Sequence, residues 1–420
     1  MPFGGLTAER ACGRLGVKTV RAYAPASGLP ESGSFGEDVY LNRLRPRCKP
    51  PWPAGRASSL APSPLVHSPY MPTKLSEFDF EYPEELIAEY PAEPRDSCRL
   101  MVVDRAEEHF EHRRFDDLPD LLDPGDVLVI NDTKVYPARL YGKKEKTGAQ
   151  IEVFLLRELN SESRLWDVVV NPARKIRIGN KLFFEHDLTA EVIDNTTSRG
   201  RTIRFVFEGN NEQLYDKIDR IGETPLPDYI ERDVEEADRE RYQTIFAKHR
   251  GAIAAPAAGM HFTEALVERL RENGIHVVPI TLHVGSGTFR EIGVEDLTKH
   301  RMDSEKFTIP EETAETVNRA LASDENSVTA VGTTVVRTLE SSLSVSKNLK
   351  ADERWTDEFI YPPYDFTITE QMITNLHPPR SSLVVMASAF TDFELLHEAY
   401  KEAYEKEYRL FTFGDAMLIR

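Results

Sequence analysis

The chain has 420 residues, a length that accommodates two or three domains of ordinary size. Apolar residues make up 40% and charged residues 29%, which is typical of a protein with a hydrophobic core and excludes a wholly disordered, collagen-like or coiled-coil chain. The formal net charge of −18 argues against non-specific nucleic-acid binding, because phosphate contacts come from clustered Lys and Arg, but it leaves room for a local basic surface.

The first 70 residues differ in composition from the rest. They hold ten of the 27 prolines, eight of the 23 glycines, and nine Lys or Arg against four Asp or Glu. Proline-rich stretches sustain neither a helix nor a central strand. We therefore expect residues 1–70 to be a disordered extension. An RNA-touching tail and a misassigned start codon stay open, since Met71 begins what looks like a complete domain.

No other signal in the sequence points to a membrane or to secretion. The longest apolar stretch, near Leu383–Phe390, is much shorter than the roughly 18 residues that cross a bilayer. The Met1 end lacks an apolar run behind a basic start. Cys12, Cys48 and Cys98 are too scattered for a disulfide framework or a Cys-based metal site. We expect a cytoplasmic protein.

From residue 71 to 136 the pattern is mixed. It predicts a short helix at Pro83–Glu89 and strands at Leu100–Asp104 and Asp126–Asn131. Between residues 137 and 208, β-branched and aromatic residues alternate in short runs separated by turn residues, which indicates a small β-barrel or sandwich. The strands expected there are Ile151–Leu156, Leu165–Val170, Lys181–Phe184, Thr189–Ile193 and Thr202–Phe207.

From about Ile221 strands alternate with helices, which indicates an α/β domain with a largely parallel sheet. Thr263 is the expected N-cap of the first helix and Gly274 its stop. The expected helices are Thr263–Asn273, Glu311–Ala322, Thr334–Leu343 and Asp392–Tyr408, and the expected strands are His276–Leu282, Val328–Val331 and Leu383–Ala389.

Three loops follow expected strands, where ligands of α/β domains bind. They are Ala255–Thr263, Leu282–Phe289 and Val331–Ser341, and the third opens a helix that Thr333 or Thr334 would cap and that carries Arg337 and Glu340. Glycine lets a backbone approach a ligand closely, and a helix N-terminus attracts an anion. None of the loops matches a P-loop or a dinucleotide fingerprint. Each loop alone is weak evidence, but together they predict a polar small-molecule site.

Four histidines lie in or near these loops: His261, His283, His300 and His377. No two of them have the short spacing of a zinc site, so we expect no metal. Imidazole titrates near neutral pH, so His283 or His261 could be a general base, while the others would be hydrogen-bonded structural residues.

Basic residues recur along the β module: Arg139, Arg174, Lys175, Arg177, Arg199, Arg201 and Arg204. Such residues commonly block pairing at strand edges. On so acidic a protein they could also form an RNA contact surface.

Several long runs resemble one family. They are EYPEELIAEYPAEPRDSCRLMVVDR from Glu81, PGDVLVINDTKVYPARLYG from Pro124, IGETPLPDYIER from Ile221, ADRERYQTIF from Ala237 and EKEYRLFTFGDAMLI from Glu405. Together with the three loops they resemble the S-adenosylmethionine:tRNA ribosyltransferase-isomerase family of queuosine synthesis. The similarity covers about Lys74–Ile419.

The resemblance implies an α/β catalytic domain, residues 71–136 and 222–420, interrupted by a small all-β barrel at 137–221. It implies that the ribosyl group of S-adenosylmethionine moves to 7-aminomethyl-7-deazaguanine in the wobble position of a tRNA, giving epoxyqueuosine, adenine and methionine. No metal and no cofactor beyond S-adenosylmethionine is implied, and the protein is expected to be a monomer.

This chemistry suggests roles for the candidate residues. His283 or His261 would be the base, with Glu305 orienting it or holding ribose hydroxyls. The helix start at Thr333 and Thr334, with Arg337, would bind the methionine carboxylate. The remaining substrate-binding candidates are Asn131, Asp132 and Arg139, at the junction with the barrel, and Gly259, Gly285, Gly287, Asn375 and His377.

The chain departs from the family's usual pattern within the signature loops. The unusual residues are Ala257, Ser286, Asp303, Val335, Pro363, Leu376 and Pro378. Pro363 replaces a glycine and so removes an N–H donor and φ freedom. The alternative reading is therefore a divergent paralogue that binds a nucleoside or RNA without ribosyl transfer. A methyltransferase is a weaker alternative, because no glycine-rich loop follows the first strand.

Overall fold

The computed structural model describes residues 73–289 and 291–420. The extension expected at 1–70, with Cys12 and Cys48, lies outside these residues. No helix within the described ranges is both long enough and apolar enough to pass through a bilayer.

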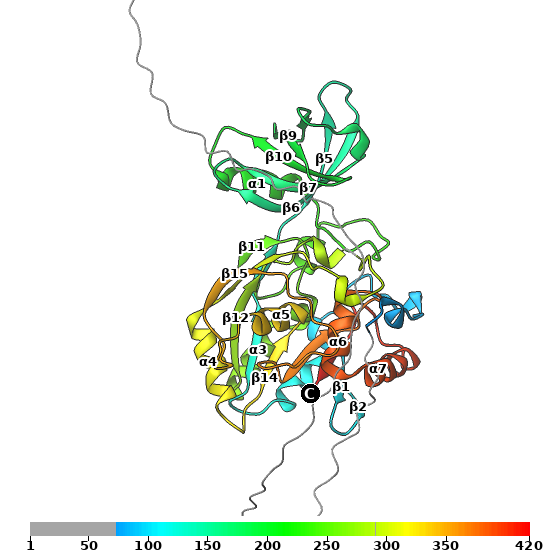
Figure 1. The fold of residues 1–420 in the computed structure, drawn as a ribbon, viewed down its shortest axis with the longest axis vertical. Helices are drawn as coiled ribbons and strands as arrows, with labels where there is room; N and C mark the ends of the chain where they lie inside the picture. The colour runs from blue at the N-terminus through cyan, green and yellow to red at the C-terminus, as the bar shows by residue number, and fades with distance from the viewer. Residues whose placement is uncertain (1–72, 290) are drawn as a thin grey trace, which may run out of the picture. The chain divides into compact units, whose positions relative to one another are not determined.

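The larger body is built on a nine-stranded sheet in the order β15-β13-β12-β3-β14-β16-β17-β1-β2 (Figure 1). The four strands β12, β3, β14 and β16 are parallel to one another, and so is the pair β1 and β17. The other neighbours are antiparallel. The bounds are β1 Arg99–Asp104, β2 His109–Arg114, β3 Val127–Asn131, β12 His276–Leu282, β13 Glu305–Ile309, β14 Val328–Val331, β15 Asp352–Thr356, β16 Gln371–Asn375 and β17 Ala416–Ile419.

This arrangement confirms the α/β class, with parallel pairing at the centre of the sheet and antiparallel pairing at both edges. Strand β3 shows why the centre is stable. Its residues are all buried, and they alternate between two hydrophobic clusters: Val127 and Val129 join one, Leu128 and Ile130 the other. A strand buried on both faces needs a continuous apolar run, as this one has.

Helices cover both faces of the sheet. Leu266, Val267 and Leu270 of α3 belong to the cluster of Leu128, whereas α4, α5, α6 and α7 supply the cluster of Val127. The bounds are α2 Asp238–Arg241, α3 Glu264–Glu272, α4 Glu311–Leu321, α5 Thr333–Ser341, α6 Ser382–Thr391 and α7 Phe393–Glu405. The 3₁₀ turns are η1 Leu75–Phe78, η2 Glu84–Leu86, η3 Arg95–Ser97, η4 Phe115–Asp120, η5 Ala173–Lys175, η6 Ala257–His261, η7 Ser286–Phe289 and η8 Leu297–Lys299.

Two expected elements are wrong in type. The strand expected at Leu383–Ala389 is part of helix α6, whose N-terminus is capped by the Ser381 hydroxyl, accepting from the Val384 N–H at 3.2 Å. An apolar run of this length is ambiguous between a strand and a buried helix, and the cap decides it. The helix expected at Pro83–Glu89 is only the 3₁₀ turn η2.

The second body is a closed barrel of six strands in the order β10-β7-β6-β5-β8-β9 (Figure 1). Its own hydrophobic cluster includes Leu214 and Ile218 of α1, which packs against it. The bounds are β5 Arg139–Lys144, β6 Gln150–Asn160, β7 Leu165–Asn171, β8 Lys181–Phe183, β9 Thr189–Asn195, β10 Gly200–Val206 and α1 Asn211–Ile221. The predicted β module is therefore a barrel. A short parallel pair, β4 Thr133–Val135 and β11 His249–Ala252, completes the strands.

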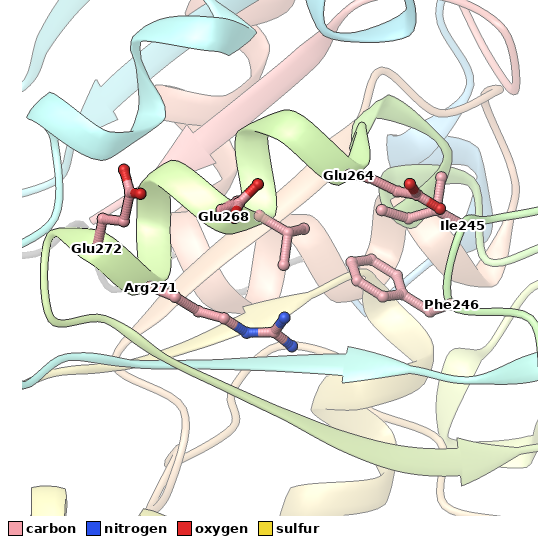
Figure 2. A pocket seen from close by; sticks show the side chains of 7 residues that line it. Ile245, Phe246, Glu264, Glu268, Arg271 and Glu272 are labelled. Carbon is pink, nitrogen blue, oxygen red and sulfur yellow. The ribbon is translucent and has the colours of Figure 1, made fainter.

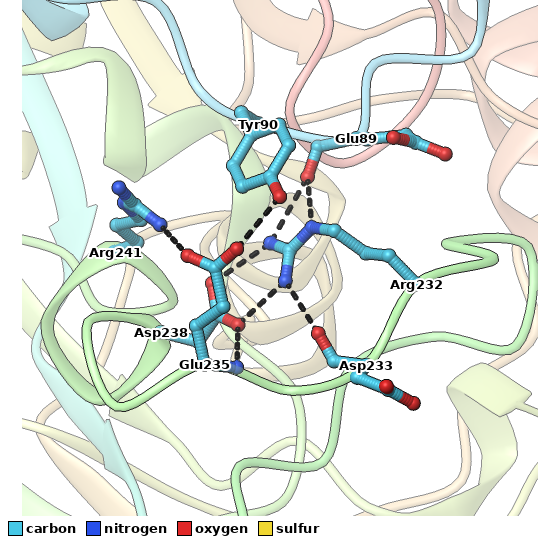
Figure 3. A network of polar contacts seen from close by, with 7 residues as sticks. All are labelled: Glu89, Tyr90, Arg232, Asp233, Glu235, Asp238 and Arg241. Carbon is cyan, nitrogen blue, oxygen red and sulfur yellow. Dashed lines mark hydrogen bonds and ion pairs between the residues drawn. The ribbon is translucent and has the colours of Figure 1, made fainter.

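A polar network holds the segment that follows α1 (Figure 3). Arg232 donates to both carboxylate oxygens of Asp238 at 2.7 and 2.8 Å, and to the backbone oxygen of Glu89. Glu235 accepts from the Tyr90 hydroxyl at 2.8 Å. Because the Asp238 side chain is fully buried, its pair with Arg232 fixes this segment firmly. The same segment carries Pro227 and Tyr229 to the wall of a cavity described next.

Candidate active site

The three strand-end loops meet at one cavity. It has a volume of about 100 Å³, and all three loops contribute to its wall. The first contributes Ala255–Ala258, the second Val284 and the third Gly332–Thr334. Asn375 and His377, which follow β16, also line it. The structure thus places the three loops around a shared hollow.

A larger cavity of about 810 Å³ lies on the other side of the second loop. His283, Gly285 and Ser286 line it, whereas Val284 between them lines the small cavity. The rest of its wall comes from residues 302–306, β11, the barrel, Tyr136, Tyr215 of α1 and Trp355 of β15. A hollow of about 20 Å³ shares Thr333 and Thr334 with the small cavity and Met302 with the large one.

A buried ion pair supports this region. The Glu305 carboxylate accepts from the Gly285 N–H at 2.7 Å and forms an ion pair with Arg337. Arg337 also donates from Nε to the Glu358 backbone oxygen at 3.1 Å. Its Nη2 is buried and has no hydrogen-bond partner in residues 73–289 and 291–420. Arg337 is one of the residues that line the 20 Å³ hollow.

The start of α5 lies at the same hollow. Gly332 is the N-cap, with φ of +91°, which favours glycine, and no side chain caps the helix. Our expectation that Thr333 or Thr334 caps it is therefore wrong, because both have already entered the helix. Uncapped N–H groups at a helix start attract anions. The helix start and Arg337 together form a site suited to a carboxylate.

His283 lines the large cavity, and its ring is positioned by contacts with Thr133 and Gly251. Its Nδ1 lies 2.9 Å from the Thr133 hydroxyl, and its ring packs on Gly251, where a Cβ would come within 2.5 Å of Nδ1. Burial, then the charges of Lys306 and His249, lowers the pKa of His283 to about 4. The ring is therefore neutral at pH 7 and can accept a proton.

Asn131 and Asp132 tie strands together instead of lining a cavity. The Asn131 amide donates to the Leu282 oxygen at 3.1 Å and to the Thr334 hydroxyl at 3.2 Å. The Asp132 carboxylate accepts from the Thr281 hydroxyl and lies 3.5 Å from Nε2 of His249. These residues position the loops after β12 and β14, which explains their place in the signature.

His261 is in the hydrophobic core and lines none of the cavities described here. Its Nδ1 lies 3.2 Å from the Cys98 sulfur, and its ring packs at 5.0 Å on Phe115. Burial lowers the pKa of His261 to about 4, with Asn375 beside it acting in the opposite direction. Of the two histidines predicted as bases, only His283 lines a cavity.

Of the other candidate residues, some line a cavity and others pack within the fold. His377 lines the small cavity, with Nε2 2.6 Å from the Thr374 hydroxyl, and Asn375 donates to the Phe411 oxygen at 3.0 Å. Gly259 packs against Thr244, and Gly287 packs against Asp303.

Arg139 is committed to the barrel, because its guanidinium pairs with Glu152 at 2.8 Å. Its backbone exchanges hydrogen bonds with Glu223, so it marks the point where the chain enters and leaves the barrel. We expected Arg139 at a substrate site, but it is not among the residues that line the three cavities.

Sequence reasoning missed the wall of the large cavity that comes from the barrel, α1, β11 and β15. Its polar and aromatic members include Tyr136, Arg157, Glu158, Trp166, Asp167, Tyr215, Arg250 and Trp355. Only Tyr136 lay in a quoted signature run, and no local spacing connects the others. Their assembly depends on barrel closure.

Two of the unusual loop residues contact each other. The Ser286 hydroxyl donates to the Asp303 carboxylate at 2.9 Å, at the wall of the large cavity. The two departures thus form one new polar pair. Ala257, another of the unusual residues, lines the small cavity.

Two further observations concern metals and other hollows. Within the described ranges, no group of three or more His, Cys, Asp or Glu side chains could hold a metal ion. A separate groove of about 670 Å³ runs along α3 and is lined by Glu264, Glu268, Arg271, Glu272, Ile245, Phe246 and Val267 (Figure 2). None of the three strand-end loops contributes a residue to the wall of this groove, so we do not assign the reaction to the groove.

Among known protein families, the family model described as "Queuosine biosynthesis protein" matches residues 75–419. The chain is 58% identical over 347 residues to the S-adenosylmethionine:tRNA ribosyltransferase-isomerase of Cytophaga hutchinsonii, and 57% identical over 348 residues to that of Flavobacterium psychrophilum. Each alignment covers 82% of this chain and 99% of the relative. A crystal structure of S-adenosylmethionine tRNA ribosyltransferase from Thermotoga maritima is 34% identical, with a TM-score of 0.46, over 82% of this chain and 100% of that one.

Proposed function

The chain belongs to the family of queuosine biosynthesis proteins, and we propose that the three adjoining cavities form its S-adenosylmethionine:tRNA ribosyltransferase-isomerase site. The enzyme is a transferase that acts on the ribosyl group of S-adenosylmethionine. The tRNA carries 7-aminomethyl-7-deazaguanine in its wobble position. Adenine and methionine leave, and epoxyqueuosine remains on the tRNA. A cytoplasmic monomer that needs no other cofactor is part of this proposal.

The free Nη2 of Arg337 beside the start of α5 carries the assignment. An arginine that is 6% exposed and has a buried, unpartnered nitrogen favours an additional hydrogen-bond acceptor, and the methionine carboxylate is an acceptor that the substrate supplies. The hollow of about 20 Å³ at Thr333, Thr334 and Arg337 has room for the carboxylate end only. The rest of the nucleoside would occupy the adjoining cavities.

His283 would remove the proton from the ribose carbon next to sulfur, which the sulfonium acidifies. The Thr133 hydroxyl lies 3.5 Å from the His249 backbone oxygen, to which it can donate. It can then accept from Nδ1–H of His283, which leaves Nε2 unprotonated as the base. Glu305 would act through Gly285, by holding the backbone between His283 and Ser286.

The amine of the tRNA base would reach the reacting carbon from the large cavity, since its volume of about 810 Å³ admits a nucleotide. In the net reaction the amine nitrogen loses a proton and bonds to a ribosyl carbon, and the ribose carbon next to sulfur loses a proton to the base. The bonds to sulfur and to adenine break, methionine leaves with the sulfur electron pair, and adenine takes up one proton. A carbon–carbon bond and the epoxide form within the ribosyl unit, so one proton is released overall. The family match favours this reading over binding without ribosyl transfer.

The direct test is to incubate the full chain with S-adenosylmethionine and tRNA bearing 7-aminomethyl-7-deazaguanine. We expect release of adenine in equal amount to a mass gain on the tRNA. The control is the same tRNA with an unmodified guanine at that position. Binding of both substrates without adenine release would support the alternative of a paralogue that does not transfer ribose.

A further inference from the structure

The barrel side of the large cavity presents three unused polar atoms. They are Oε1 of Glu158, Nε1 of Trp166 and Nη2 of Arg250, each buried and without a hydrogen-bond partner in the part of the chain that the structure describes. All three residues line the same cavity. Trp166 is only 3% exposed. Buried polar groups are normally paired, so one acceptor and two donors left open in one cavity point to a ligand.

Several contacts show that the three residues are neighbours. Glu158 on β6 and Trp166 on β7 lie opposite each other in the barrel register. The Tyr215 hydroxyl donates to the other oxygen of Glu158 at 2.7 Å, and the Arg250 guanidinium lies 5.5 Å from the Tyr215 ring centroid. Arg250 also lies 4.8 Å from the ring centroid of Tyr136, which packs edge-on against Trp166 at 5.8 Å.

The surrounding bonds hold the three groups in fixed states. Burial and the contact with Glu158 raise the pKa of Tyr215 to about 12, so this phenol stays protonated and keeps donating. The other nitrogen of Arg250 pairs with Asp219. Glu158 and Arg250 therefore each keep one partner in the protein, while all three residues retain an unpaired polar atom and line the cavity.

The pattern fits the edge of a guanine-type base. That edge carries two N–H donors, at N1 and at the 2-amino group, beside the O6 acceptor with its two lone pairs. A carboxylate oxygen can accept from the N–H groups while arginine and indole N–H donate to O6. An adenine edge, with a donor where O6 stands, does not match. Enzymes that act on a base read its extruded edge in this way, between aromatic side chains.

We propose that Glu158, Trp166 and Arg250 form the subsite that recognises the 7-deazaguanine base of the tRNA, with Glu158 as the residue that selects the 2-amino group. This inference rests on the proposed function for the identity of the base. The subsite adjoins the reaction centre, because Arg250 is followed by Gly251, on which the His283 ring packs.

The test measures binding apart from catalysis. Anticodon stem-loops carrying 7-aminomethyl-7-deazaguanine, or the analogue without the 2-amino group, are titrated against the full chain by fluorescence anisotropy. We expect the wild-type protein to prefer the 2-amino base about tenfold, as for one charged hydrogen bond to a base edge. Glu158→Gln should weaken binding of the 2-amino base and bring this ratio close to one. Glu191→Gln, at a partly exposed carboxylate of the same barrel that pairs with Arg204, should leave the ratio at the wild-type value.

An unchanged ratio in Glu158→Gln, or equal binding of both stem-loops by the wild-type protein, would overturn the inference. Trp166→Phe keeps the ring and removes the N–H, so it should weaken both stem-loops about fivefold with the ratio preserved. It provides the test if Glu158→Gln does not fold, since wild-type affinity in Trp166→Phe would also overturn the inference. Selective binding without adenine release would leave the inference standing and refute the proposed reaction.

Discussion

At the scale of single residues, His283 is distinguished from the other buried histidines by its access to the large cavity. His261 and His377 are as strongly shifted in pKa, but the first is in the core and the second lines the small cavity. A low pKa alone therefore does not identify a base. His283 combines a lowered pKa and an Nδ1 held by Thr133 with a place in the wall of the large cavity, which is what the proposed role as base requires.

We predict that His283→Ala lowers the rate of adenine release by about 10²–10⁴-fold, the usual contribution of a general base, while the affinity for S-adenosylmethionine changes little. Because the pKa of His283 is about 4, its ionisation should leave the wild-type rate flat from pH 8 to 6 and reduce it as the pH approaches 4. Adenine release measured across this range checks both statements. His186→Ala, an exposed barrel residue, is the matched control, and a rate in His283→Ala close to that of this control would refute the role as base.

At the scale of elements, α5 joins the ion pair to the anion site, because Arg337 and the uncapped first turn belong to the same nine-residue helix. Lysine keeps the charge of Arg337 but has a single nitrogen, which cannot bind Glu305 and a carboxylate in the same fork geometry. We predict that Arg337→Lys raises the Kd for S-adenosylmethionine at least tenfold, with little effect on tRNA binding. Calorimetric titration measures this value. Arg319→Lys on the exposed side of α4 is the control, and equal affinities in the two variants would contradict the assignment.

Elements with local signals were predictable from the sequence. Helix α3 has its Thr263 cap, accepting from Leu266 at 3.2 Å, and the barrel strands have their alternation. Helix α6 has the same kind of cap at Ser381, but its apolar residues run all round, so period alone did not separate helix from strand. Strands β16 and β17 are four or five residues long and lacked a pattern of their own.

From the sequence, the site was predictable only where the direction of the strands determines which loops meet. The loops after β12 and β14 meet because these parallel strands end at the same edge of the sheet. The subsite of Glu158, Trp166 and Arg250 was not predictable, because its residues come from β6, β7 and β11 and meet only after the barrel closes. Its signal is the set of unused polar atoms, which only side-chain geometry shows.

At the scale of the whole molecule, the buried His261 and His377 and the partly buried His283 make folding sensitive to acid. Burial is the main cause that lowers the pKa values of His261 and His283 to about 4 and that of His377 to about 3, against about 6.5 in an unfolded chain. Between these values the unfolded chain binds more protons than the folded protein, so the free energy of unfolding falls as the pH falls. These histidines therefore do not lower the free energy of unfolding above about pH 7. They lower it progressively as the pH falls from about 6.5 toward 4.

We predict that the slope of the unfolding free energy against pH near pH 5 corresponds to nearly three protons, at about 1.4 kcal/mol per pH unit for each. Urea titrations at closely spaced pH values measure this slope. His261→Gln should reduce it by about one proton, because glutamine does not titrate, whereas His186→Gln on the barrel surface should leave it as in the wild type. The carboxylates with lowered pKa values, such as Asp238, act mainly at lower pH. Equal slopes in the two variants would mean that His261 is not held neutral by its burial against Phe115 and Cys98.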